Sequence, residues 1–202
     1  PSAVFCFLKS NESLSAPDIQ INFTPGTHQR GMQSTLENQP GFTMATWQHR
    51  PESQGYVKAK STDPFAHPEI QPNYLAAETD QNVILAAIKI CRKLAKTEAL
   101  KPFVVEETFP GAACQNDSEL LNSAREIGQS IYHLMGTCRM GNKNDKTAVV
   151  DAELKVHGIK NLRVIDASIM PTMVSANLNA AVMMIAEKGA DMVLGKLTAK
   201  PY

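Results

Sequence analysis

A histidine in the last third of this 202-residue chain is the residue best suited to chemistry. His133 stands within the segment Tyr132–Gly141, which reads YHLMGTCRMG. Imidazole is the side chain best matched to taking a proton from a hydroxyl group at neutral pH. A histidine can equally be a buried residue whose two nitrogens are satisfied by the backbone, so the histidine alone leaves both interpretations open.

Two further motifs follow the histidine segment in the chain. They are Leu162–Pro171, which reads LRVIDASIMP, and Asn177–Ala180, which reads NLNA. Taken in order, the three motifs resemble the glucose-methanol-choline (GMC) flavin oxidoreductases, in which the first carries the catalytic histidine and the other two close the FAD site. Asn177 followed by Leu-Asn-Ala is similar to the choline dehydrogenase branch. The resemblance implies the C-terminal part of an FAD-dependent enzyme that oxidises a CH–OH group by hydride transfer to flavin.

The resemblance also implies roles for five residues. His133 would be the base, and Asn177 would hold the substrate oxygen as it gains alkoxide character. Asp166, Ala167 and Asn179 would bind the cofactor, with Asn179 close to the flavin ring. Plainer interpretations stand beside these roles: Asn177 could be a helix N-cap, and Asp166 could be an ordinary turn residue.

A part of the expected enzyme lies outside this sequence. Family members hold the FAD pyrophosphate on a glycine-rich turn before a helix, and no G-x-G-x-x-G occurs here. We therefore predict a fragment that is inactive and free of FAD by itself. Its expected partners are the N-terminal FAD-binding half of the same polypeptide, a small alcohol substrate and an electron acceptor of unknown identity.

Composition excludes several classes of protein. Lys plus Arg (20) equals Asp plus Glu (20), so no net charge favours nucleic acid as a partner. The four cysteines form no C-x-x-C motif, and the five histidines show no ligand spacing, so no metal site is predicted. Reduced cysteines fit a cytoplasmic protein, with membrane association through the missing part left open.

The hydrophobic pattern predicts an α+β fold. Strands are expected over residues 2–9, 18–23, 42–48 and 56–60 in one antiparallel sheet, with one buried face on the second strand. Helices are expected from a Thr79 or Asp80 cap to Lys96 and from Asp117 to Ile127. The first has an apolar stripe on one face, formed by Val83, Ala86, Ala87, Ile90 and Leu94. Residues 1–137 would form the substrate-binding domain.

The remaining residues, 138–202, would complete the FAD-binding domain with a strand at 162–165 and a helix at 177–194. The start of that helix is apolar on every side, so we expect it to be buried, in the intact enzyme against the FAD domain and the flavin. A competing hypothesis is a non-catalytic α+β module that binds a small molecule or a protein. An upstream G-x-G-x-x-G would favour the enzyme.

Overall fold

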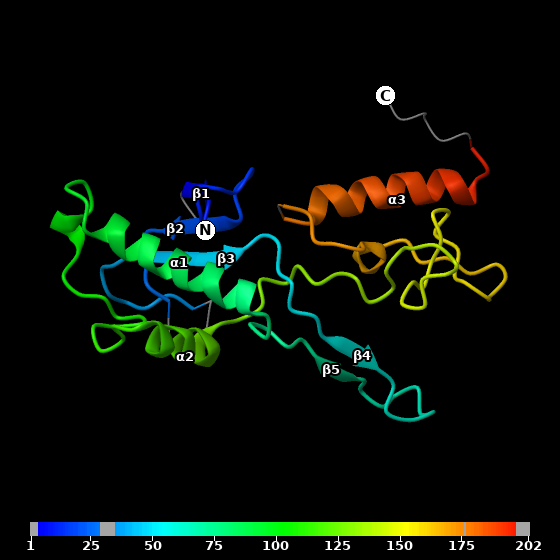
Figure 1. Cartoon of the computed structure of the whole chain (residues 1–202), viewed down its shortest axis with the longest axis horizontal. Helices are drawn as coiled ribbons and strands as arrows, with labels where there is room; N and C mark the ends of the chain where they lie inside the picture. Colours follow the sequence, from blue (N-terminus) through cyan, green and yellow to red (C-terminus); the bar gives the residue numbers. More distant parts are fainter. Residues whose placement is uncertain (1–3, 29–34, 176, 197–202) are drawn as a thin grey trace. The chain divides into compact units, whose positions relative to one another are not determined.

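The structure, a computed structural model, describes residues 4–28, 35–175 and 177–196 and divides the chain into two compact units (Figure 1). The first unit contains Pro1–Gly55 and Ile70–Ser130, and the second contains Tyr56–Glu69 and Ile131–Tyr202. The described residues form small antiparallel sheets and three α-helices, which confirms the predicted α+β class. The assignment of residues 1–137 and 138–202 to substrate and FAD domains stays a prediction.

A three-stranded antiparallel sheet forms the centre of the first unit. It contains β1 (Val4–Leu8), β2 (Ile19–Thr24) and β3 (Thr43–Gln48) in that order. These are the first three predicted strands, of which residues 2–3 lie outside the described residues. Directly paired residues share a face of the sheet, and the pairing places Cys6 opposite Ile21 and Ile21 opposite Thr46.

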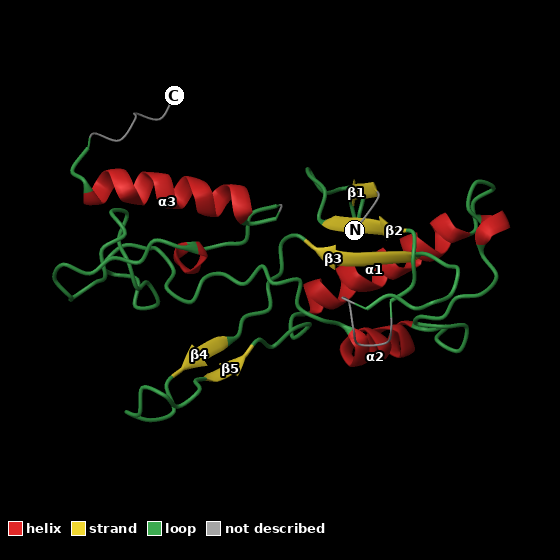
Figure 2. Ribbon diagram, turned by 180° about the vertical axis from the view of Figure 1, so that it is seen from behind, coloured by secondary structure: helices red, strands yellow, loops and turns green. Residues whose placement is uncertain are grey.

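Helix α1 (Glu78–Ala95) covers one face of this sheet (Figure 2). Its apolar side packs on Ile19 and Ile21 of β2, which are almost completely buried. The predicted helix stripe takes part in this core without exception: Val83, Ala86, Ala87, Ile90 and Leu94. Spacing of three and four residues was a sufficient signal because it repeats over about three turns of one helix.

The expectation that only one face of β2 is buried is wrong. Gln20 points away from the α1 side, yet it is 1% exposed. Its Oε1 lies 2.9 Å from His49 Nε2, and its Nε2 donates to Asn22 Oδ1 at 3.0 Å. A polar side chain can be buried at little cost when its hydrogen bonds are made, and this network makes them.

The start of α1 also differs from the prediction. The N-cap position is Ala77, which makes no side-chain cap hydrogen bond. Asp80 instead lies within the helix at 2% exposure, and its two oxygens accept from the backbone N–H groups of Glu52 and Ser53 at 2.9 and 2.8 Å. The carboxylate therefore ties the preceding loop to the helix, because a buried carboxylate needs hydrogen-bond donors and the two loop amides supply them.

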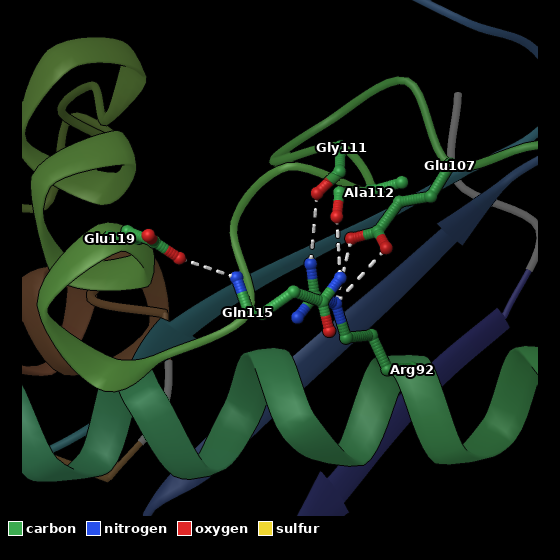
Figure 3. Close-up of polar contacts among 6 residues, drawn as sticks. All are labelled: Arg92, Glu107, Gly111, Ala112, Gln115 and Glu119. Atoms are coloured by element: carbon green, nitrogen blue, oxygen red, sulfur yellow. Dashed lines mark hydrogen bonds and ion pairs between the residues drawn. The ribbon is translucent and has the colours of Figure 1, made fainter.

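The chain after α1 is held by polar contacts to that helix (Figure 3). Arg92 Nε donates to both carboxylate oxygens of Glu107, at 2.9 and 3.0 Å, and Arg92 Nη2 donates to the Gly111 carbonyl at 3.2 Å. The short 3₁₀ helix η1 (Lys101–Phe103) lies in this segment. Helix α2 (Asp117–Ile127) then begins with a capping box formed by Asn116 and Glu119, and it packs on α1.

The fourth predicted strand does not join the first sheet. Strand β4 (Tyr56–Lys58) pairs with β5 (Glu69–Gln71) in a separate two-stranded sheet. We did not predict β5, because three residues are too few to show an alternating pattern. Gly55 precedes β4, and a Cβ there would lie 1.9 Å from the carbonyl oxygen of Gln71. The close approach of these two backbone segments therefore requires glycine.

The second unit has its own core around helix α3 (Asn179–Val193) and the 3₁₀ helix η2 (Ala167–Ile169). The buried residues of this core come from the loops and from both helices: Val150, Leu154, Ile169, Met170, Leu178 and Ile185. The strand predicted at residues 162–165 is wrong, because this segment makes only an isolated bridge between Lys155 and Arg163.

Glycine sets the closest approach in this core. Gly189 of α3 is buried, and a Cβ at this position would lie 2.4 Å from Ile165 Cγ2. A branched side chain cannot retreat without leaving its rotamer. Ile165 therefore packs directly on the helix backbone at Gly189.

We expect Gly189→Ala to lower the midpoint of thermal unfolding. Alanine gains about 1 kcal/mol of helix propensity, but overpacking a core typically costs about 1–3 kcal/mol. A double-mutant cycle with Ile165→Ala in the complete protein measures the clash directly. The Ala substitution at 189 should be less destabilising, or stabilising, when Ile165 has been truncated. Equal effects of Gly189→Ala in both backgrounds would show that the contact is not tight.

No helix in the described part of the chain is both long and apolar enough to cross a membrane.

Candidate functional site

The histidine motif is hydrogen-bonded to the segment that begins with Asp166. The backbone N–H of Gly136 donates to Ala167 O at 3.4 Å, and that of Cys138 donates to Ser168 O at 2.9 Å. The N–H of Met140 donates to Ile169 O at 2.7 Å. Two of the motifs identified in the sequence thus run side by side. We call these three hydrogen bonds the backbone ladder.

Gly136 allows the ladder to begin just after the histidine. Its φ of +85° lies in the left-handed region that glycine adopts without a steric penalty. Met135, immediately before it, packs on the core of the second unit. His133 is therefore two residues from a fixed point and is itself partly buried.

The third motif approaches from the other side of the same core. Leu178 is buried in this core and occupies the N-cap position of α3, with no side-chain cap hydrogen bond. The alternative interpretation of Asn177 as the helix cap is therefore wrong. Its side chain is directed elsewhere.

Asn177 Nδ2 lies 2.7 Å from His133 Nε2, although the two residues are 44 positions apart. An amide nitrogen can only donate, so Nε2 must accept through its lone pair. With the amide oriented in this way, Nε2 is the acceptor of the contact. When the amide donates to another acceptor instead, the same lone pair can take a proton from a hydroxyl group.

Asp166 serves the local turn in this structure. It is the N-cap of η2, and its Oδ1 accepts from the backbone N–H of Ser168 at 2.8 Å. The carbonyl of Ala167 accepts from Gly136 in the backbone ladder. Contact of Asp166 and Ala167 with a cofactor stays a prediction, and the geometry adds that Ala167 holds the histidine motif while Asp166 caps the turn beside it.

Asn179 is the first residue of α3 and is exposed. Its Nδ2 makes a weak contact with Met183 Sδ at 3.7 Å. Met183 and Met184 of the helix start are 59% and 57% exposed in this chain, and burial of the helix start in the intact enzyme stays a prediction. The helix start therefore offers donors and apolar surface next to the His133–Asn177 pair.

The other described histidines lie outside this arrangement. His157 Nε2 is 3.1 Å from the carbonyl oxygen of Gly141, and His49 belongs to the network of the first unit. His67 is exposed. Sequence reasoning missed the left-handed backbone of Tyr132, whose φ is 62°, since tyrosine gives no signal for such a conformation.

Comparison with known proteins identifies the family. The GMC oxidoreductase family model matches residues 51–186, so the chain belongs to the GMC oxidoreductases, a family of FAD-dependent flavoproteins that bind alcohol substrates. The resemblance given by the three motifs is thereby confirmed. All three motifs lie within the matched residues.

Curated relatives in the family are choline dehydrogenases. The chain is 43% identical over 190 residues to the mitochondrial choline dehydrogenase of Mus musculus, covering 94% of this chain and 32% of the relative. It is 42% identical over 189 residues to the oxygen-dependent choline dehydrogenase of Proteus mirabilis, covering 94% of this chain and 34% of the relative. The chain thus spans about a third of the length of the curated relatives it matches.

Solved structures show the same fold. The pyridoxine 4-oxidase of Mesorbium loti matches with a TM-score of 0.82 at 25% identity, over 98% of this chain and 38% of that chain. A formate oxidase of Aspergillus oryzae RIB40, studied for FAD modification, matches with a TM-score of 0.80 at 29% identity, over 90% and 32%. The arrangement of elements is therefore that of the C-terminal region of GMC oxidoreductases.

We expect Asn177→Ala to leave the stability of α3 almost unchanged, because the side chain caps no helix. Asn116→Ala is the matched control, since Asn116 accepts from Glu119 N and forms a capping box on α2. Loss of such a cap typically costs about 1 kcal/mol. Denaturant unfolding of the complete protein compares the two variants. A loss for Asn177→Ala as large as that for Asn116→Ala would contradict the structure at this site.

Proposed function

We propose that this chain is the C-terminal part of an FAD-dependent alcohol dehydrogenase in which His133 is the base and Asn177 holds the substrate oxygen. The observation that carries the proposal is the 2.7 Å contact between His133 Nε2 and Asn177 Nδ2. It brings a proton acceptor and a neutral donor to one place from motifs that are distant in the sequence. Membership in a family that oxidises alcohols supports the same roles.

The residues of this site fit FAD on their donor chemistry. The N-terminus of α3 has no side-chain cap, and Asn177 and Asn179 place amide groups at that exposed end. The N-terminal end of a helix carries partial positive charge, which favours an anionic reduced ring by about 1 kcal/mol or less at exposed sites. We propose that Asn179 and the adjoining helix amides lie against the flavin, and that Asp166 and Ala167 line the pyrophosphate side. When bound, FAD supplies the acceptor for the hydride from the substrate carbon.

His133 and Asn177 then have separate tasks. The neutral imidazole accepts the hydroxyl proton at Nε2 as the carbon-bound hydrogen leaves. The Asn177 amide donates either to Nε2 before substrate binds or to the substrate oxygen afterwards. An amide donor placed where negative charge develops stabilises that charge without having to reorganise. The substrate hydroxyl thus replaces one hydrogen bond by two.

The substrate class follows from the relatives. The two relatives described above are choline dehydrogenases, and we propose a small alcohol of the same class as the substrate. The N-terminal half of the polypeptide would supply the FAD pyrophosphate site, and an electron acceptor outside this chain would reoxidise the flavin. The four free cysteines suit a reducing compartment, which supports a cytoplasmic location, with any membrane association made by the rest of the protein.

We expect His133→Ala to slow flavin reduction by alcohol by about 10²-fold or more, the usual scale for loss of a general base. Stopped-flow absorbance of the complete flavoenzyme measures this step apart from reoxidation. His67→Ala, at an exposed histidine away from the pair, is the matched control and should reduce at the wild-type rate. Rates for His133→Ala within a factor of about two of wild type would remove this histidine from the mechanism, given the scale above.

A further inference from the structure

The residue before the catalytic histidine has an unusual backbone. Tyr132 has a φ of 62°, in the left-handed region that bulky L-residues rarely adopt. Strained backbone of this kind persists only where the surrounding structure imposes it, and it is concentrated at functional sites. The observed conformation is thus a reason to look for a role at this position.

Of the four other described non-glycine residues with positive φ, three have simpler explanations, and Leu75, with a φ of 56°, is the exception. Asn73 and Asn161 are of the type that tolerates this region best. Leu154 has a φ of 64°, but its side chain is 3% exposed, so core packing offsets the strain. The Tyr132 side chain is 83% exposed, so burial of its own ring does not account for its backbone.

The local geometry suggests what the conformation achieves. Burial alternates from residue to residue after the turn: Tyr132 is exposed, His133 partly buried, Leu134 exposed and Met135 packed on the core. Such alternation means that successive side chains point to opposite sides. The backbone conformation of Tyr132 therefore determines to which side the His133 imidazole points.

We propose that Tyr132 is a positioning residue whose left-handed backbone directs the His133 imidazole toward Asn177. The proposal rests on the function proposed above for His133. It assigns the effect to the backbone dihedral and not to the phenol ring. The consequence is that residue types should be tolerated at position 132 according to their preference for positive φ.

Three substitutions separate backbone from ring in the complete flavoenzyme. Tyr132→Asn removes the ring but accepts positive φ, Tyr132→Phe keeps the ring and the same backbone, and Tyr132→Val introduces a β-branched residue for which positive φ is an outlier. We expect kcat within about twofold of wild type for Tyr132→Asn and Tyr132→Phe. For Tyr132→Val we expect about a tenfold loss of kcat with little change in KM, because a left-handed backbone is most unfavourable for a β-branched residue.

Leu134→Val is the matched control, because it places the same residue type on the other side of His133, where no positive φ is recorded. Its kcat should equal that of wild type. If Tyr132→Val fails to bind flavin or to fold, Tyr132→Asn decides: wild-type turnover supports the proposal, and a loss in this variant overturns it.

Two results would overturn the positioning role while leaving the base in place. They are a wild-type kcat for Tyr132→Val, and an Asn variant as slow as the Val variant, which would assign the effect to the ring. His133→Ala is measured alongside. Full activity in that variant would instead refute the proposed function itself, so the two failures are distinguishable.

Discussion

The backbone ladder between residues 136–140 and 167–169 is the constraint on which the site depends. It holds the histidine motif against η2. Ile169 and Met170 pack in the same core as Leu178, the residue next to Asn177. Without the ladder, His133 would lie in an exposed loop with no fixed distance to any partner. Because these hydrogen bonds join backbone groups, they do not depend on the side chains of the ladder residues. They nevertheless limit where the nearby His133 side chain can lie. The close contact at Gly189 anchors α3 to the same segment through Ile165.

The candidate site exposes apolar and polar side chains next to each other. The start of α3 exposes Met183 and Met184, Asn177 is exposed, and His133 is partly exposed. Exposed apolar surface next to polar groups marks a place where a ligand or another part of a protein binds. In the proposed enzyme, this surface would be covered by flavin and by the rest of the polypeptide. In that enzyme, this chain would supply the proton-handling residues and the helix end.

Sequence patterns predicted the parts of the fold that repeat over many residues. The stripe on α1 and the alternation on β2 each involve several positions, and both elements are present. Asp80 was expected to cap α1, but tertiary contacts with the amides of Glu52 and Ser53 took its carboxylate instead. Gln20 was expected to face water, but it is satisfied by a histidine from β3's end, which no local pattern can show. Short elements such as β5 carry too few residues to be predicted.

The candidate site was predictable in its residues but not in its geometry. The three motifs indicated His133 and Asn177 together through their resemblance to one family. Only the structure shows that they are 2.7 Å apart, that Asn177 caps no helix, and that Asp166 is engaged in its own turn. The strand predicted at residues 162–165 failed because an apolar run can pack against a helix as an extended loop, as Ile165 does.

The central claim is that His133 and Asn177 act as one unit on the alcohol, and a double-mutant cycle of the flavin reduction rate tests it most directly. The variants are His133→Ala, Asn177→Ala and the double variant, each loaded with FAD in the complete enzyme. Residues that act as a unit are strongly non-additive. We predict that the double variant is about as slow as His133→Ala alone. Losses that multiply in the double variant would contradict the account.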